Sequence, residues 1–140
     1  FYNLHTTIFR LVDFQLSYLG SPATDLQYFM NSSASFEVLI NDRHVLIEEY
    51  YKTLCETLSK LGHENLQPTK DVLNSELDKR GLFGALTAFT VRAFAQADRD
   101  HLPDVDNLMK NNATLHMSEP YKEGLKKLMP FYEKWGWLKI

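Results

Sequence analysis

Apolar residues recur at helical spacing along most of this 140-residue chain. The longest such pattern runs from about Phe36 to Leu61. This period predicts an amphipathic helix. Ser35 precedes the pattern as a candidate N-cap, and Gly62 follows it as a candidate end. We expect the apolar stripe to face a protein core, at positions 36, 40, 47, 50, 51, 54, 58 and 61.

A shorter helix is predicted before it, starting at Ser21-Pro22 and ending at about Asn31. The serine hydroxyl can cap the first free amides, and proline at the first helical position loses no backbone hydrogen bond. We expect three apolar side chains of this helix to point inward, namely Leu26, Phe29 and Met30.

Two further helices are predicted in the middle of the chain. Thr69 can cap a helix over about Lys70–Lys79, which Gly81 should end. The next pattern, Leu82–Ala97, has small or apolar residues at nearly every position, which is typical of a buried helix. We therefore expect Leu86 and Phe89 to lie in the core. Arg92 is the only charged residue of this pattern, so it should either reach water or pair with a carboxylate.

The last predicted helix begins at Ser118-Glu119-Pro120 and contains Pro130, which should kink or interrupt it. Gly136 is expected to end the helix, and Trp137-Leu138 to fold back onto the core. The apolar stripe of this helix comprises Tyr121, Leu125, Leu128, Tyr132 and Trp135.

One short β element is predicted near the beginning. The apolar run within Ile8–Phe14 is bounded by a turn and lacks clean alternation, which favours a strand that is covered on both faces. Asp13 lies at its carboxyl end, just before a Gly- and Pro-bearing turn. A carboxylate in that position can bind Mg²⁺, which completes its shell with water and substrate phosphates. Asp25 falls in the first turn of the next helix, where the helix dipole stabilises a negative charge.

These two acidic residues lie in a stretch that resembles a known family. Val12-Asp13-Phe14-Gln15 and Gly20-Ser21-Pro22-Ala23-Thr24-Asp25-Leu26 are similar to the insect choline-kinase-like family, often called ecdysteroid-kinase-like. That family shares its fold with aminoglycoside phosphotransferases and choline kinases. By this resemblance, Asp13 would bind the Mg²⁺ that bridges the ATP phosphates. Asp25 would accept hydrogen bonds from backbone amides of the catalytic loop and hold that loop in shape.

The resemblance implies an architecture as well as a site. It predicts a mainly α fold with a short β element, the carboxyl-terminal helical lobe of a kinase-like domain. The similarity is specific over Val12–Phe29, and weaker at Tyr50-Tyr51-x-x-Leu54 and at Gly136-Trp137-Leu138. We expect residues 1–140 to form one partial domain.

Several parts that phosphoryl transfer requires do not occur in the chain. A kinase needs a phosphate-covering loop, a Lys on a strand, a catalytic Asp and a metal-binding Asn. Twelve residues precede Asp13, and none of them matches H-x-D-x-x-x-x-N. The chain also starts without Met. We therefore interpret it as a fragment that lacks the nucleotide-binding lobe and the catalytic loop, with no catalytic residue of its own.

In the intact parent, the resemblance implies an ATP- and Mg²⁺-dependent kinase that phosphorylates a hydroxyl group of a small molecule such as an ecdysteroid. The partners of this chain would then be the substrate and the missing amino-terminal lobe. The alternative is a non-catalytic helical interaction module or a degenerate kinase-like gene product. The isolated chain should be inactive in either case.

Composition and charge limit the expected partners and location of the chain. A net charge of −3 and a pI near 5.9 give no electrostatic reason to expect nucleic acid or anionic membrane as a partner. No apolar run approaches the roughly 18–20 residues that span a bilayer. Cys55 is the only cysteine and excludes an intrachain disulfide, which fits a reducing, cytoplasmic location. It lies on the apolar stripe of the long helix, so we expect it to be buried.

The sequence does not support a calcium site, a histidine metal site or a glycosylation site. Asp98–Asp106 contains four aspartates, but Pro103 and Met109 occupy the positions where an EF-hand loop needs Gly and Glu. A solvated acidic loop explains it better. The five histidines show no metal-ligand spacing. Two glycosylation sequons, at Asn31 and Asn112, are expected to be coincidental.

Overall fold

The computed structural model describes residues 14–98 and 116–138, and within these ranges the chain is mainly helical. Two 3₁₀ turns are present, η2 (Phe14–Leu16) and η4 (Glu64–Leu66), together with two π-helical segments, η3 (Val38–Asp42) and η5 (Ala88–Arg92). The α-helices are α1 (Pro22–Ser33), α2 (Arg43–Lys60), α3 (Lys70–Lys79), α4 (Gly81–Thr87), α5 (Ala93–Ala95) and α7 (Glu119–Lys134).

The described residues contain no β-strand; their only β pairing is an isolated antiparallel bridge between Ala97 and Met117. The strand predicted over Ile8–Phe14 lies outside the described ranges except for Phe14, which begins the 3₁₀ turn η2 and is exposed. The prediction of a mainly α fold is confirmed, and within the described ranges the predicted β element is not found.

Two of the predicted helix starts, at Ser21 and Thr69, are confirmed by their capping bonds. The Ser21 hydroxyl accepts from the Ala23 amide at 3.3 Å, and the Thr69 hydroxyl accepts from the Val72 amide at 3.2 Å. These bonds satisfy amides that have no partner inside the helix. Gly62 and Gly136 follow α2 and α7 with φ of 73° and 74°, a conformation in which glycine avoids a side-chain clash.

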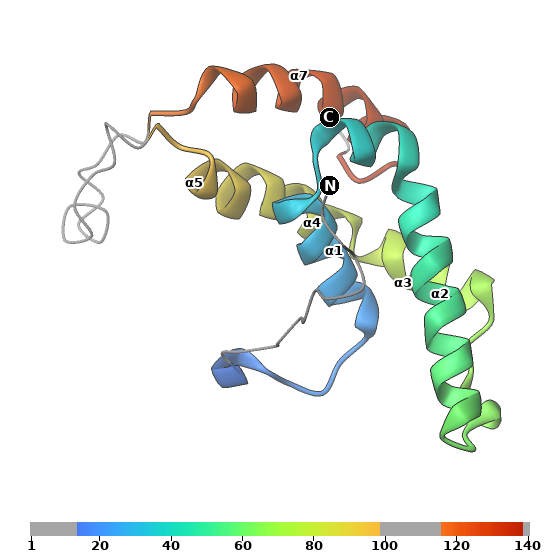
Figure 1. Cartoon of the computed structure of the whole chain (residues 1–140). Coiled ribbons are helices and arrows are strands. Elements are labelled where there is room, and N and C mark those ends of the chain that lie inside the picture. Colours follow the sequence, from blue (N-terminus) through green and yellow to red (C-terminus); the bar gives the residue numbers. More distant parts are fainter. Residues whose placement is uncertain (1–13, 99–115, 139–140) are drawn as a thin grey trace, which may run out of the picture.

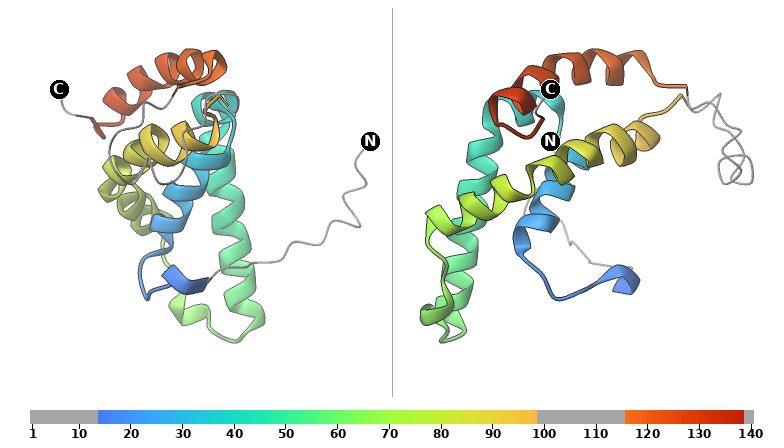
Figure 2. Two further views of the ribbon diagram at one scale, coloured as in Figure 1. Left: turned by 90° about the vertical axis from the view of Figure 1, so that its left-hand side faces the viewer. Right: turned by 180° about the vertical axis from the view of Figure 1, so that it is seen from behind.

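Figures 1 and 2 show α1 at the centre of the helical assembly, with the chain from α4 to α5 crossing it and α7 running above that chain. α1 packs against α3, α4 and η5, and η3 packs against α7. The long helix α2 lies beside α3 at one side. The core therefore forms where α1 meets the middle of the chain and α7.

Two buried amide side chains on α1 tie these helices together. Gln27 Nε2 donates to the Leu77 carbonyl of α3 at 2.8 Å, and Asn31 Nδ2 donates to the Gln27 side-chain oxygen at 3.0 Å. Tyr132 Oη of α7 donates to Asn31 Oδ1 at 2.6 Å. Burying polar groups is costly unless they are hydrogen-bonded, and here they are. Gly84 of α4 permits this packing, because a Cβ there would lie 2.6 Å from the Asn31 amide nitrogen.

This arrangement corrects the predicted inward face of α1. Met30 is buried as expected, but Phe29 is 59% exposed and Leu26 is only partly buried. Gln27 and Asn31 occupy the buried positions instead. The prediction was based on hydropathy alone. In the structure, the buried positions are taken by amide side chains that form hydrogen bonds with other helices. Since Asn31 is 1% exposed, its sequon is not accessible in the folded chain.

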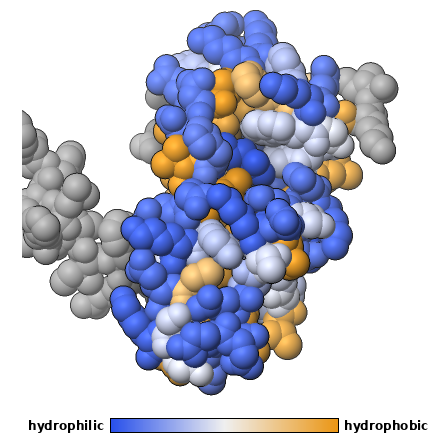
Figure 3. Space-filling model, turned by 90° about the vertical axis from the view of Figure 1, so that its right-hand side faces the viewer, coloured by the Kyte–Doolittle hydropathy of each residue, from blue (hydrophilic) through white to orange (hydrophobic). Residues whose placement is uncertain are grey.

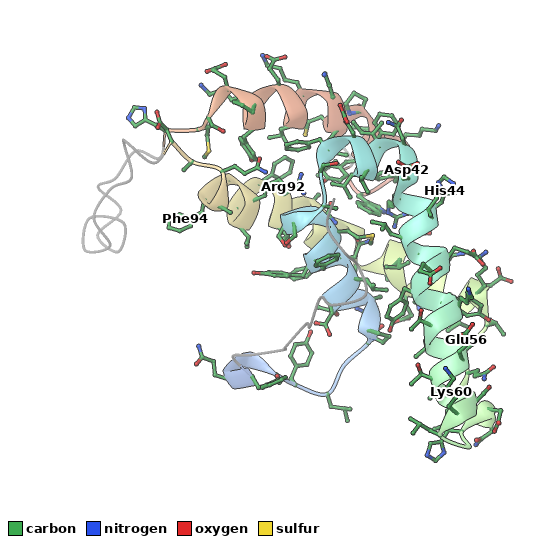
Figure 4. All side chains as sticks on the ribbon, in the orientation of Figure 1. Asp42, His44, Glu56, Lys60, Arg92 and Phe94 are labelled. Atoms are coloured by element: carbon green, nitrogen blue, oxygen red, sulfur yellow. The ribbon has the colours of Figure 1, made fainter. Side chains whose placement is uncertain are left out.

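Arg92 is fully buried, and neither of the two predicted environments, contact with water or pairing with a carboxylate, is found. It reaches no water and pairs with no described carboxylate. Its Nη2 donates to the carbonyls of Met30 and Ala34, and its guanidinium lies 4.4 Å from the centre of the Phe36 ring. The carboxyl end of α1 carries partial negative charge, which stabilises a cation. Figure 4 shows Arg92 pointing inward at this junction.

The prediction that Leu82–Ala97 is buried all round is wrong. Its small residues Ala85, Ala88 and Ala93 are buried, whereas Leu86 is 50% exposed and Phe89 is only partly buried. The alanines allow close approach on one side, and the larger side chains stand on the other. The helix break predicted at Gly81 occurs one residue earlier. Arg80 ends α3, and Gly81 begins α4.

The π segment η5 interrupts this helix, and sequence periodicity does not show it. Tyr121 Oη of α7 donates to the Ala88 carbonyl at 3.0 Å. A π segment disturbs the regular i→i+4 bonds, so an external donor at this point stabilises it. The second π segment, η3, lies within the long helix predicted to begin at Phe36.

The carboxyl-terminal segment folds back as predicted. Trp137 is 6% exposed and packs over Gly81, where a Cβ would overlap its ring. The Arg43 guanidinium of α2 lies 5.1 and 4.9 Å from the ring centres of Trp135 and Trp137. Such cation–π contacts stabilise a partly buried arginine. The predicted interruption at Pro130 is not found, because α7 continues through it.

The long helix α2 is less buried than the apolar stripe predicted over Phe36–Leu61 indicates. Ile47 is its only buried residue within α2, and Cys55 is partly exposed rather than buried. Leu61, at the end of the stripe, is 64% exposed. The end of α2 therefore extends away from the main core, as Figure 1 shows.

The burial pattern predicts different effects for two leucines. Leu77→Ala should lower the free energy of unfolding by about 2–5 kcal/mol, because Leu77 is 1% exposed. Leu86→Ala should cost less than about 1 kcal/mol, because half of that side chain is already in water. Urea unfolding of both variants measures the difference; equal costs would contradict the burial described here.

Tyr132 gives a prediction that depends on pH. Tyr132→Phe should destabilise the chain by about 1–3 kcal/mol, because Asn31 Oδ1 loses its buried donor. Burial raises the pKa of the Tyr132 phenol above its ordinary value. In the unfolded chain tyrosine ionises near about pH 10, whereas folded Tyr132 keeps its proton, so stability falls as pH rises past that value.

The Tyr132→Phe variant should therefore lose less stability between about pH 9 and 11 than the parent does. Tyr28→Phe is the control, since Tyr28 is 45% exposed and makes no hydrogen bond with a described residue. Chemical denaturation at several pH values measures both variants. An unchanged pH slope after Tyr132→Phe would contradict the assignment.

Candidate functional site

Of the two predicted site residues, the structure describes one. Asp13 lies outside the described ranges, so its predicted role stays a prediction. Asp25 lies in the first turn of α1 with an exposed side chain. No hydrogen bond or ion pair joins it to another described residue. The buried side of α1 carries Gln27 and Asn31, so their network fixes Asp25 on the outward side.

Asp25 lines two adjoining hollows of about 440 and 480 Å³. Both are also lined by Tyr18, Thr24 and Tyr28. The first extends to the serines and the glycine before α1, and the second extends to Arg80 and Phe83 at the start of α4. Aromatic walls with a few polar groups are typical of binding hollows.

A polar network fixes one side of these hollows. Arg80 Nε donates to Thr24 Oγ1 at 3.1 Å, and Arg80 Nη1 donates to Glu76 Oε2 at 2.6 Å. Hydrogen bonds from Lys79, Arg80 and Ser21, in that order of effect, lower the pKa of the Glu76 carboxyl to about 2. Glu76 is therefore ionised at neutral pH, and Arg80 is held in one orientation next to the amino end of α1.

The carboxylate of Asp25 also acts on the long helix. The pKa of the Tyr50 phenol is raised, first by burial and then by the negative charge of Asp25. Tyr50 belongs to α2, so the charge of Asp25 also acts on a side chain of the long helix.

The described residues do not form a metal site by themselves. No group of three or more His, Cys, Asp or Glu side chains converges in the described ranges. Asp25 is the only acidic residue among the described residues that line the two hollows. Among the described helices, none combines the length and the apolar composition needed to cross a bilayer.

Sequence reasoning missed most of the surroundings of Asp25. Arg80 and Glu76 are an i, i+4 pair at the end of α3, and that spacing was a usable signal. Nothing local in the sequence indicates that Phe83 would lie beside residues of the 18–28 stretch, because this proximity depends on how α4 packs on α1.

The structure predicts that Asp25 contributes little to stability. Asp25→Asn should change the free energy of unfolding by no more than about 1 kcal/mol, since it loses only a favourable interaction with the helix dipole. Asp71→Asn, in the first turn of α3, is the matched control. Only Asp25→Asn should lower the pKa of Tyr50, which ring-labelled NMR titration can measure. An unchanged Tyr50 pKa, or a loss of stability above about 2 kcal/mol, would contradict this geometry.

The comparisons with known proteins bear on the same part of the chain. No curated protein and no solved structure matches the sequence. One family does, the ecdysteroid kinase-like family, over residues 3–63. The matched range contains Asp13, Asp25 and Tyr50, and it ends before α3. The resemblance predicted from the residues around Asp13 and Asp25 is thereby confirmed, and residues 3–63 are similar to the ecdysteroid kinase-like family.

Proposed function

We propose that this chain is the carboxyl-terminal helical part of a small-molecule kinase, which transfers the γ-phosphate of ATP to a hydroxyl group. The observation that carries the proposal is the ecdysteroid kinase-like match over residues 3–63, with both Asp13 and Asp25 inside it. The helical content of the described residues agrees with a helical lobe.

Asp25 has the properties that a bracing residue needs. It is held outward on a helix whose other side is anchored, it is exposed, and its oxygens are not used by described residues. A carboxylate can accept two or more backbone amide hydrogen bonds, and such charge-assisted bonds are strong. We assign to Asp25 the positioning of a catalytic loop that docks against the amino end of α1.

Asp13 is the proposed ligand for Mg²⁺. The metal, when bound with ATP, would neutralise charge on the phosphates as phosphoryl transfer proceeds. Mg²⁺ commonly takes only one or two protein carboxylates, so a single aspartate is a sufficient contribution from this chain. The catalytic Asp and the phosphate-covering loop would come from another part of the kinase domain.

The acceptor would be a small molecule bearing a hydroxyl group. The family name points to ecdysteroids, and we propose an ecdysteroid or a related alcohol as the substrate. The single cysteine, Cys55, is consistent with a reducing cytoplasmic location.

The second candidate is a non-catalytic helical interaction module. The exposed apolar residues of the chain from α4 to α5 favour it, because contiguous apolar surface often marks a protein–protein contact. The two candidates differ in whether Asp13 and Asp25 matter for phosphoryl transfer.

The deciding experiment joins this chain to the amino-terminal half of an ecdysteroid kinase-like domain and measures phosphoryl transfer. Asp13→Asn should lower kcat by about a thousandfold or more, because the metal acts mainly on the transition state. Asp25→Asn should lower kcat as well, with little change in folding. Asp71→Asn is the control and should leave turnover unchanged.

Turnover of the Asp13→Asn variant within about threefold of the parent would overturn the metal assignment, since a lost metal ligand costs orders of magnitude. If the joined protein folds and the parent sequence shows no transfer with any hydroxyl substrate tried, the interaction module is the better account.

A further inference from the structure

A further hollow, of about 640 Å³, lies where the folded-back carboxyl-terminal segment meets α3 and α4. We call it the Trp137 hollow. Its apolar wall comes from segments far apart in the sequence, namely Leu82 of α4, Phe89 of η5, Met129 of α7, and Trp137 and Leu138 after α7. Figure 3 views the side of the molecule on which α2 and α3 lie, where hydrophilic residues dominate the surface. Against that surface the hollow is a local apolar feature, and its volume is typical of small-molecule sites.

The Trp137 hollow is separate from the candidate site at Asp25. None of its lining residues lines either of the two hollows beside Asp25. A ligand in it would therefore be held by residues other than those assigned to phosphoryl transfer. An inference about this hollow stands or falls independently of the proposed function.

Trp137 presents a fixed donor that has no acceptor. Its ring stacks on Tyr132 with 5.6 Å between the ring centres, and its backbone amide donates to the Tyr132 carbonyl at 2.9 Å. Trp137 is 6% exposed, and its indole Nε1 is buried without a hydrogen-bond partner. Buried donors in folded proteins are almost always hydrogen-bonded, so an unmet donor in the wall of a hollow points to an acceptor oxygen on a ligand.

The ligand oxygen can reach this donor through a small change in the wall. Because Nε1 is enclosed, an incoming group has to displace part of the wall. Met129 lines the same hollow, and its unbranched side chain adopts new conformations more readily than an aromatic ring does.

Asp78, in the last turn of α3, adds an acceptor to the same hollow. Its side chain is exposed, and no hydrogen bond or ion pair joins it to another described residue. Lys79, the other charged residue of the lining, is already paired with Glu76 at 2.9 Å. Burial lowers the pKa of the Arg43 guanidinium, and the charge of Asp78 partly raises it again. Since Arg43 also lies 4.9 Å from the centre of the Trp137 ring, Asp78 and Trp137 share a neighbour.

We propose that the Trp137 hollow binds a neutral, apolar small molecule whose polar end both accepts and donates a hydrogen bond, as an alcohol does. The ligand oxygen accepts from Trp137 Nε1, and its hydroxyl donates to the Asp78 carboxylate. The apolar body lies against Leu82, Phe89 and Met129. An ammonium group could not accept from the indole, and a carboxylate could not donate to Asp78 and would be repelled by it.

The test is calorimetric titration of this chain with three probes of the same apolar body: naphthalenemethanol, its methyl ether and naphthoate. The ether can accept from Trp137 but cannot donate to Asp78, and naphthoate carries the excluded charge. The alcohol should bind at least about fivefold more tightly than either of the others, because only it uses both groups.

Two variants separate the two hydrogen bonds. Trp137→Phe should weaken binding of the alcohol and of the ether at least about fivefold, because both lose the indole donor. Asp78→Ala should weaken binding of the alcohol by a similar factor and leave the ether within about twofold. Trp135→Phe and Asp71→Ala are the matched controls, since neither residue lines the hollow; both should keep the parent affinities. Circular dichroism checks that each variant folds, and Asp78→Ala, at an exposed position, serves if Trp137→Phe does not fold.

Three results would overturn the proposal: no binding of the alcohol, equal binding of the alcohol and its ether, or an alcohol affinity that Asp78→Ala leaves unchanged. Tighter binding of naphthoate than of the alcohol would also overturn it, in favour of an anionic ligand. The titrations contain neither ATP nor a second polypeptide, so their outcome does not depend on whether the kinase function is correct.

Discussion

The buried hydrogen bonds of Gln27 and Asn31 determine how the rest of the structure is arranged. They connect α1 to the end of α3 through Leu77 and to α7 through Tyr132. Amides in a core fix one geometry more strictly than apolar side chains do, because a shifted helix would leave them unsatisfied. Gly84 lets α4 approach close enough to enclose them.

This constraint also sets what the surface presents. With one side of α1 committed to the network, Asp25 and Tyr28 must face outward, next to Phe83 of α4. Arg92 reinforces the same arrangement from the other end of α1, where it binds the terminal carbonyls. Helix α1 thus presents a carboxylate near its amino end, beside the aromatic side chains of Tyr28 and Phe83.

Much of the helical layout follows from local sequence signals. Ser21, Thr69, Gly62 and Gly136 act at helix ends through chemistry that depends on a few neighbouring residues. The partly wrong predictions concern burial. Hydropathy placed Phe29 and Leu86 inside and gave no reason to bury Gln27. Those outcomes depend on partners fifty or more residues away, such as the Leu77 carbonyl, and local periodicity carries no information about them. The same limit applies to the candidate site. A family motif pointed to Asp25, but no local signal indicated that Arg80 and Phe83 would lie near it.

The most direct test of the account is amide hydrogen exchange of this chain, alone and with the amino-terminal half of an ecdysteroid kinase-like domain. If the Asp25 end of α1 meets the catalytic loop of a kinase domain, as we propose, exchange should slow in residues 21–29 and stay unchanged in residues 43–60. New protection confined to residues 43–60, or none anywhere despite a folded partner, would contradict the account.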